Sequence, residues 1–300
     1  MRRKVEFATE DGTILRGHIH SEGTDPAPGI VMAHGFGGVH AQIEHYAEFF
    51  AAAKLSVLVY DHRGFGVSDG LPRQEVNPYW QLLDWRDAIS FAATQPEFQP
   101  DAGFGVWGSS FAGGLAMMTA ANDPRVRCVA CQIPNVSGHR NTARLYTPEQ
   151  RAQIMRLAAQ DRAGRLQGKE PLTLPIFQTH AGELSAFMLD IPDDIIERAS
   201  RSPKWKNEIT VRSLEHNIEF EPAGWMPYVS PKPLLMIVAE HDVCTFTDIQ
   251  KDVFDALPEP KRLLSYPGGH FAAYVEFFQE TAGPARDWFK DHLHDNRLKA

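Results

Sequence analysis

The stretch Trp107-Gly108-Ser109-Ser110-Phe111-Ala112-Gly113-Gly114 carries the strongest indication of how this chain folds. It follows a short apolar run and precedes an Ala- and Met-rich run at 111–121, so it lies where a buried strand passes into a helix. A serine in such a sharp turn projects its hydroxyl above the sheet edge and needs small side chains two residues before and after it. Gly108 and Ala112 meet that need around Ser110, and the spacing disfavours Ser109. The alternative is a serine that only caps a glycine-rich helix.

Short apolar runs recur along the chain and indicate strands that are buried on both faces. They lie at 29–33, 55–60, 103–107, 126–131, 234–239 and 262–266, after a predicted hairpin at 4–8 and 14–19. Helical spacing of apolar residues separates them near 43–50, 82–89, 111–121, 249–254 and 271–293. Strands and helices that alternate in this way predict an α/β fold, with a mostly parallel sheet of about eight strands and helices on both faces.

One long stretch breaks this alternation. From 134 to 228 no buried strand is evident, and the only clear helix candidates are Pro148–Leu166 and Asp193–Ser200. A long insertion in an α/β sheet more often has a function than none. We therefore expect a core formed by residues 1–133 and 229–300, with a helical lid at 134–228 between the sixth and seventh strands.

Two further polar residues follow predicted strands in the order that a serine nucleophile requires. Asp242 comes after the strand at 234–239, and His270 comes after the strand at 262–266, behind two glycines. A serine hydroxyl needs an adjacent base, and that base needs a partner that orients it. Asp242 and His270 are the predicted acid and base; Glu240 and Asp248 are alternative acids, whereas His241 should point elsewhere.

A glycine-rich segment, His34-Gly35-Phe36-Gly37-Gly38, directly follows the strand at 29–33. Acyl transfer places negative charge on the substrate oxygen, which two backbone N–H groups usually stabilise. Phe36 and Phe111 are the predicted donors, and His34 is predicted to be a structural hydrogen-bonding residue. The glycine-rich stretch 61–70 lacks the pattern of a phosphate-binding loop, so we interpret it as a structural loop anchored by Asp61 and Arg63.

The composition excludes several classes of protein. The 300 residues carry a formal net charge of −8 and no basic run, which argues against nucleic-acid binding. No run approaches the ~18 apolar residues of a membrane span, and the basic start lacks the apolar core of a signal peptide, so a cytoplasmic protein is expected. The sequence leaves the oligomeric state open, and a homodimer is one alternative.

The sequence also predicts neither a metal nor a cofactor. The three cysteines form no disulfide framework, and Cys128 and Cys131 should point to opposite faces of one strand. Two histidine pairs, His40 with His45 and His292 with His294, are expected to lack the further ligands that a metal site needs.

Together these segments resemble the α/β-hydrolase superfamily over nearly the whole chain. Several short sequence segments resemble a narrower group that includes fungal polyketide transferases and dienelactone-hydrolase-like or Xaa-Pro-peptidase-like bacterial hydrolases. These segments are 5–7 with 16–17, 60–64, 68–70, 107–111, 260–262 and 269–271. The resemblance implies a triad of Ser110, Asp242 and His270, a helical lid and no cofactor. It does not identify the substrate.

We therefore expect a serine hydrolase that cleaves a carboxylic ester or thioester of a small acyl substrate, free or carrier-bound, through an acyl-enzyme. Acyl transfer and carbon–carbon bond hydrolysis are alternatives with the same triad, and a non-catalytic binding protein is disfavoured because all three residues are present. The lid should supply an apolar acyl pocket. Its candidate lining residues are Phe187, Met188, Trp225, Met226 and Tyr228.

Overall fold

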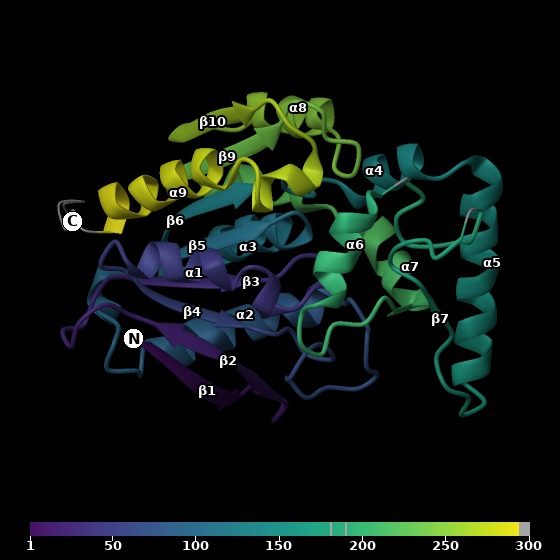
Figure 1. Ribbon diagram of the computed structural model, residues 1–300, viewed down its shortest axis with the longest axis horizontal. Helices are drawn as coiled ribbons and strands as arrows, with labels where there is room; N and C mark the ends of the chain where they lie inside the picture. Colours follow the sequence, from purple (N-terminus) through teal and green to yellow (C-terminus); the bar gives the residue numbers. More distant parts are fainter. Residues whose placement is uncertain (181, 190, 294–300) are drawn as a thin grey trace.

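The computed structural model describes residues 1–180, 182–189 and 191–293. Its centre is a sheet in which, among these residues, eight strands lie in the order β1-β2-β4-β3-β5-β6-β9-β10 (Figure 1). The strands are β1 (Arg2–Ala8), β2 (Ile14–His20), β3 (Gly29–Ala33), β4 (Ser56–Tyr60), β5 (Phe104–Ser109), β6 (Val126–Gln132), β9 (Leu234–Ala239) and β10 (Lys261–Tyr266). β2 runs antiparallel to both β1 and β4, and the remaining neighbours are parallel. The predicted mostly parallel sheet is confirmed.

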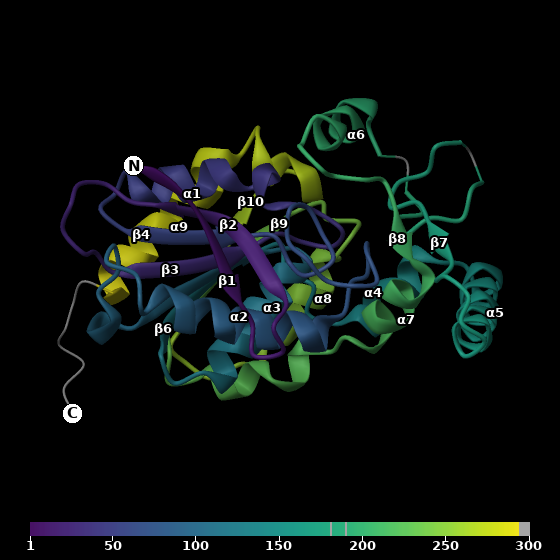
Figure 2. The ribbon, with the colours of Figure 1, turned by 90° about the horizontal axis from the view of Figure 1, so that it is seen from below.

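Helices cover both faces of the sheet (Figure 2). One face packs against α1 (Glu44–Ala51) and α9 (Phe278–Leu293), and the other against α2 (Pro78–Ala92), α3 (Phe111–Asn122) and α8 (Thr247–Asp255). Neighbouring strand residues point to opposite faces. On β5, Trp107 packs on Tyr46 of α1 with ring centroids 4.6 Å apart, whereas Val106 belongs to the opposite core.

The same alternation separates two of the cysteines. Cys128 lies in the core beneath α1 and α9, and Cys131 lies in the core beneath α2 and α3, as predicted. All three cysteines are free and buried. No helix in the described ranges is both long enough and apolar enough to cross a membrane.

The segment between β6 and β9 lies at one end of the sheet (Figure 1). It contains α4 (Gly138–Leu145), α5 (Pro148–Arg165), β7 (Thr173–Leu174), α6 (Asp193–Ser200), β8 (Ile209–Thr210), α7 (Val211–Glu219) and the 3-10 turns η3 (Pro222–Gly224) and η4 (Met226–Val229). Two of these helices, α5 and α6, match the predicted ones. The short polar helices α4 and α7 were not predicted, and neither were the strands β7 and β8, which at two residues each are too short to display a periodic pattern.

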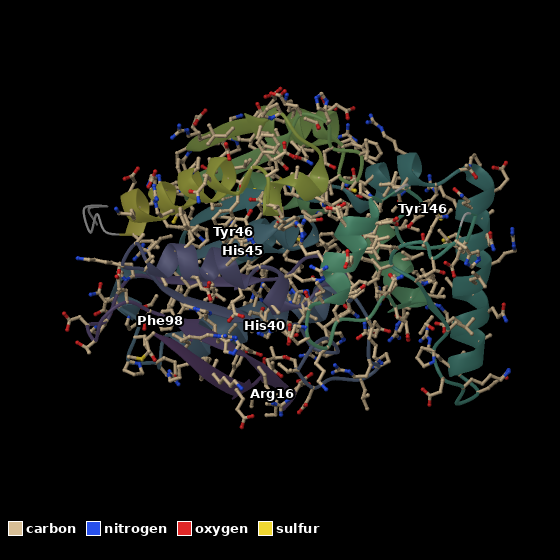
Figure 3. The ribbon with its side chains drawn as sticks, viewed as in Figure 1. Arg16, His40, His45, Tyr46, Phe98 and Tyr146 are labelled. Carbon is tan, nitrogen blue, oxygen red and sulfur yellow. The ribbon has the colours of Figure 1, made fainter. Side chains whose placement is uncertain are left out.

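Specific contacts tie this segment to the sheet. Arg144 of α4 pairs with Asp248 of α8 (Nη1–Oδ1 2.7 Å), and Arg140 pairs with Asp252 (Nη2–Oδ2 2.7 Å). The backbone of β8 joins the loop after β4, where the Thr210 N–H donates to the Gln74 carbonyl at 2.9 Å. Tyr146, labelled in Figure 3, donates to the Ala186 carbonyl at 2.6 Å and so holds the inside of the segment together.

The C-terminal helix differs from the prediction of one helix over 271–293. Residues His270–Tyr274 form the 3-10 turn η5, and α9 begins only at Phe278. The other 3-10 turns are η1 (His40–Gln42) and η2 (Pro100–Ala102). The tight turn at η5 fixes the backbone at His270, directly after β10.

Candidate active site

Ser110 occupies a strained turn between β5 and α3. Its backbone has φ 57° and ψ −123°, a left-handed conformation that is rare for a residue with a side chain. Such strain persists where packing imposes it, and it occurs preferentially at functional sites. A Cβ on Gly108 would collide with the backbone of Ala112, which explains the small residue two positions before Ser110. The Ser110 N–H donates to the Gln132 carbonyl at 2.8 Å and holds the turn against β6.

The structure brings Ser110, His270 and Asp242 into one hydrogen-bonded chain. Nε2 of His270 lies 3.0 Å from Oγ of Ser110, and Nδ1 lies 2.9 Å from Oδ2 of Asp242. The three residues are only 8%, 4% and 5% exposed. Because Nδ1 faces a carboxylate, it carries the proton, which leaves the lone pair of Nε2 directed at the serine.

A network of donors holds the Asp242 carboxylate. The N–H groups of Cys244 and Thr245 donate to Oδ1 at 2.8 and 2.9 Å, and the Thr245 hydroxyl donates to Oδ2 at 2.8 Å. Burial alone would raise the pKa of Asp242, but the charge of His270 and these hydrogen bonds hold it below its ordinary value. Asp242 therefore stays ionised at neutral pH.

Thr245 is a positioning residue that was not predicted from the sequence. Besides its bond to Asp242, its hydroxyl accepts from Nε2 of Gln250 at 2.8 Å. The spacing Asp242-x-x-Thr245 could have indicated this role, because an aspartate carboxylate often accepts hydrogen bonds from the residues that closely follow it in the chain. The other acids lie elsewhere: Glu240 accepts from Ser265, and Asp248 pairs with Arg144.

The two predicted oxyanion donors lie side by side. The rings of Phe36 and Phe111 meet edge to face with centroids 5.5 Å apart. Phe111 is the first residue of α3, so its N–H has no partner within the helix, and among the described residues the Phe36 N–H donates to no backbone carbonyl. A Cβ on Gly35 would lie 3.2 Å from the Ser109 carbonyl, so the loop packs directly on the serine turn. Neither N–H group therefore has a hydrogen-bond acceptor among the described residues, as the predicted role requires.

His34 supports this loop instead of reacting. Its Nδ1 donates to the Gly35 carbonyl at 2.9 Å, and its Nε2 accepts from the His62 N–H at 3.1 Å. Burial lowers the pKa of His34 to about 4, so the ring is neutral. The predicted role as a structural hydrogen-bonding residue agrees with these contacts.

The loop 61–70 is anchored as predicted. Asp61 accepts from the N–H groups of His40 and Val67 at 2.6 and 2.8 Å. Arg63 binds the buried Asp84 with Nε–Oδ2 2.7 Å and also contacts Asp11. Because η1 begins at His40, two residues after the loop at 34–38, Asp61 also fixes the segment that carries Phe36.

A cavity of about 400 Å³ lies over Ser110 and His270. Its sheet-side wall includes Phe36, Ile43, His45, Phe271 and Tyr274. The wall from the segment between β6 and β9 includes Ile176, Phe177, Phe187, Ile195, Arg198 and Trp205. The cavity is therefore largely apolar, as acyl sites are, with a single described arginine on its lining.

The pocket residues predicted from sequence are only partly correct. Phe187 lines the cavity, and the partly buried Met188 packs behind it with its sulfur 3.3 Å from the Ser185 N–H. Trp225 and Tyr228 are instead 44% and 68% exposed, and Met226 is buried in the core away from the cavity. These three residues lie in η4 or next to it, where the chain returns to β9 beneath α3.

A second hollow of about 430 Å³ adjoins the first. Ile195, Arg198, His270 and Phe271 line both spaces. The remaining wall includes Leu189, Ile191, His241, Val243, Cys244 and Glu276. His270 therefore borders two separate spaces, only one of which contains Ser110.

Comparison with known proteins assigns the family. The model of the family described as serine aminopeptidase, S33, matches residues 24–276. The chain belongs to this family. The S33 family consists of serine hydrolases with the α/β-hydrolase fold, so the predicted fold and class of enzyme are confirmed.

Several relatives match over most of the chain. Thiohydrolase aneE of Aspergillus aculeatus is 34% identical over 273 residues, with 88% of this chain and 84% of the relative covered. Quorum-quenching protein AidA of Acinetobacter baumannii is 30% identical, with 88% and 86% covered. The crystal structure of the α/β hydrolase GrgF from Penicillium sp. sh18 superposes with a TM-score of 0.86 at 28% identity, with 98% and 99% covered. Polyketide transferase grgF of Penicillium sp. is 29% identical, with 97% of each chain covered, so the predicted resemblance to polyketide transferases is confirmed.

Proposed function

We propose that this protein hydrolyses thioesters or esters of small, largely apolar acyl groups through an acyl-enzyme on Ser110. The observation that carries the proposal is the 3.0 Å contact between Ser110 Oγ and His270 Nε2 at the floor of an apolar cavity of about 400 Å³. Small-molecule and carrier-bound acyl thioesters or esters share the carbonyl that this arrangement would attack. The thiohydrolase names of relatives favour a thioester.

The reaction follows from the geometry. Ser110 Oγ attacks the carbonyl carbon and its proton passes to His270 Nε2, while Asp242 stabilises the resulting imidazolium. The N–H groups of Phe36 and Phe111 bind the oxyanion. The carbon–sulfur bond breaks, and the thiolate takes the proton from His270 as it leaves. A water molecule then gives its proton to His270 and attacks the acyl carbon. The bond between the acyl carbon and Ser110 Oγ breaks, Oγ takes the proton back from His270, and the carboxylic acid is released.

The segment 134–228 is proposed to act as a cap over the core formed by 1–133 and 229–300. It supplies one wall of the cavity, including Phe187 and Trp205. A thioester surrogate such as an acyl-N-acetylcysteamine tests the function, with released thiol measured by a thiol-reactive dye. We expect turnover with the wild type and none above background with Ser110→Ala. Equal thiol release by the two proteins would refute the proposal.

Acyl transfer is a second candidate function, favoured by the second hollow beside His270. After the acyl-enzyme forms, an alcohol, amine or thiol bound there would compete with water for the acyl carbon. Relatives named polyketide transferase and acyltransferase point in the same direction. Product analysis with and without added acceptors distinguishes the two: transfer yields the acylated acceptor at the expense of the free acid.

We further propose a cytoplasmic location. Cys128, Cys131 and Cys244 are free thiols, which a reducing compartment preserves.

A further inference from the structure

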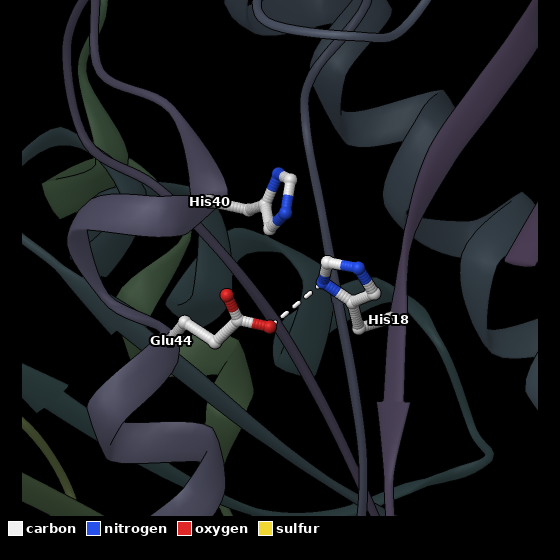
Figure 4. A group of neighbouring side chains, drawn as sticks. All are labelled: His18, His40 and Glu44. Atoms are coloured by element: carbon white, nitrogen blue, oxygen red, sulfur yellow. Dashed lines mark ion pairs between the residues drawn. The ribbon is translucent and has the colours of Figure 1, made fainter. Parts of the chain in front are cut away.

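Three histidines and a glutamate converge between β2 and the start of α1, outside the catalytic site. His18 and His20 are two residues apart on β2, so their side chains point to the same face of the strand. Glu44 is the first residue of α1, and His40 lies in η1 just before it. The expectation that His40 lacks further metal-binding residues near it is therefore wrong. His294, which was paired with His292 in the same expectation, lies outside the described residues. Figure 4 shows His18, His40 and Glu44 facing one another.

The distances are those of a potential ligand set. Oε1 of Glu44 lies 2.7 Å from Nδ1 of His18 and 3.0 Å from Nε2 of His20. One ligand atom from each of His18, His40 and Glu44 lies within 4.8 Å of the others. A tetrahedral Zn²⁺ holds ligand atoms about 3.3 Å apart, so shifts on the order of an ångström would bring these atoms onto one ion.

His40 is oriented as a metal-binding histidine would be. In Figure 4 the ring nitrogen far from the main chain, Nε2, faces His18 and Glu44. The other nitrogen, Nδ1, lies 2.9 Å from Oδ1 of Asp61, although its N–H is not well aligned with that oxygen. Histidine ligands of metals usually direct their second nitrogen at a carboxylate, which orients the ring and strengthens its binding.

We propose that His18, His40 and Glu44 form a divalent transition-metal site with a preference for Zn²⁺, with His20 as an additional imidazole beside it. Two imidazoles and a carboxylate suit Zn²⁺ better than Mg²⁺ or Ca²⁺, which bind oxygen ligands. His18, His20 and His40 are 7%, 3% and 8% exposed, so the ligands are held by the surrounding core. The ion would join β2 to the segment that continues from the loop bearing Phe36.

Arg2 would compete with a metal ion for Glu44 and His18. Its Nε lies 2.9 Å from Oε1 of Glu44, and its Nη2 lies 3.3 Å from both ring nitrogens of His18. The Arg2 side chain is 52% exposed and can swing into solvent. Removing its charge should therefore tighten metal binding by about two- to fivefold, the range of an exposed ion pair.

Zn²⁺ competition against a chromophoric chelator at pH 7 tests the proposal. The His270→Ala protein serves as the reference, because Asp242, Cys244 and His270 form a second cluster of metal-binding residue types. We expect one bound Zn²⁺ per chain, loss of about 100-fold or more in affinity in Glu44→Gln and His18→Ala, and tighter binding in Arg2→Gln. The matched control His216→Ala, which removes a part-buried histidine of α7, should bind like the reference.

Binding that is absent in the reference protein, or unchanged in both Glu44→Gln and Arg2→Gln, would overturn the proposal. Glu44→Gln preserves the size of the side chain, so its fold can be checked by circular dichroism before titration. The proposal is independent of the acyl-enzyme, because Ser110→Ala should bind Zn²⁺ as tightly as the wild type.

Discussion

Nε2 of His270 and Oγ of Ser110 lie 3.0 Å apart although 160 residues separate them in the chain. β10 places the histidine and β5 places the serine, with β6 and β9 between the two strands. The turn at Ser110 and the 3-10 turn at His270 both leave the same edge of the sheet. The contact is therefore a consequence of strand order, and it makes the imidazole available as a base.

Asp242→Asn should reduce kcat by about 10⁴-fold, because an amide in place of the carboxylate stabilises neither the required tautomer nor the imidazolium. Steady-state rates on an acyl thioester measure the effect. Glu240→Gln changes a neighbouring acid that contacts Ser265 instead, so it serves as the control. If Glu240→Gln lost more activity than Asp242→Asn, the assignment of the acid would be wrong.

Phe36→Pro should lower kcat by about 10²–10³-fold, because proline lacks the N–H that is proposed to bind the oxyanion. Phe36→Leu retains the N–H and an apolar side chain in the cavity, and we expect less than a tenfold loss. Thermal unfolding of both variants checks that the loop remains folded. Equal rates in two folded variants would show that this N–H has no catalytic part.

Phe187→Ala should raise KM for medium-length acyl chains by about tenfold, because the ring lines the cavity and its loss removes apolar contact with the substrate. Tyr228→Ala provides the comparison, since Tyr228 is 68% exposed and outside the cavity. KM values over a series of acyl lengths separate the two. A larger effect of Tyr228→Ala would restore the pocket predicted from sequence.

The stability of the protein should depend on Asp61 in acid. Burial would raise the pKa of Asp61, but hydrogen bonding and the charge of His40 lower it to about 2 from an ordinary 3.8. The ionised form of Asp61 therefore contributes about 2 kcal/mol to the free energy of unfolding above pH 4. About half of this contribution is lost by pH 3, and the remainder is lost as the pH falls through 2.

Asp61→Asn lacks this dependence. The difference in free energy of unfolding between wild type and Asp61→Asn, measured by urea denaturation, should therefore shrink by about 1 kcal/mol between pH 5 and pH 3. A difference that stays constant over this range would mean that the pKa of Asp61 is not lowered by its contacts.

The buried strands of the core were predictable from sequence, whereas the short elements between β6 and β9 and the meeting of side chains from separate elements were not. Buried runs such as 234–239 display their strand character locally, and Ser110, Asp242 and His270 each follow such a run. Trp225 and Tyr228 were misassigned because an apolar residue has no local signal that distinguishes a cavity wall from a surface. Glu44 and His18 meet only because β2 lies beside the start of α1, a relationship that residue spacing does not contain.

The central claim, that Ser110 is the nucleophile, is tested most directly by reaction with a fluorophosphonate. Mass spectrometry of the intact protein counts the added groups, and sequencing of the modified peptide locates them. Ser109→Ala is the matched control, because Ser109 is the adjacent buried serine and its hydroxyl is bound to that of Tyr274 at 2.8 Å. The account predicts one added phosphonyl group, located on Ser110, in the wild type and in Ser109→Ala, and none in Ser110→Ala. Labelling of folded Ser110→Ala at the wild-type rate, or a modified residue other than Ser110, would contradict it.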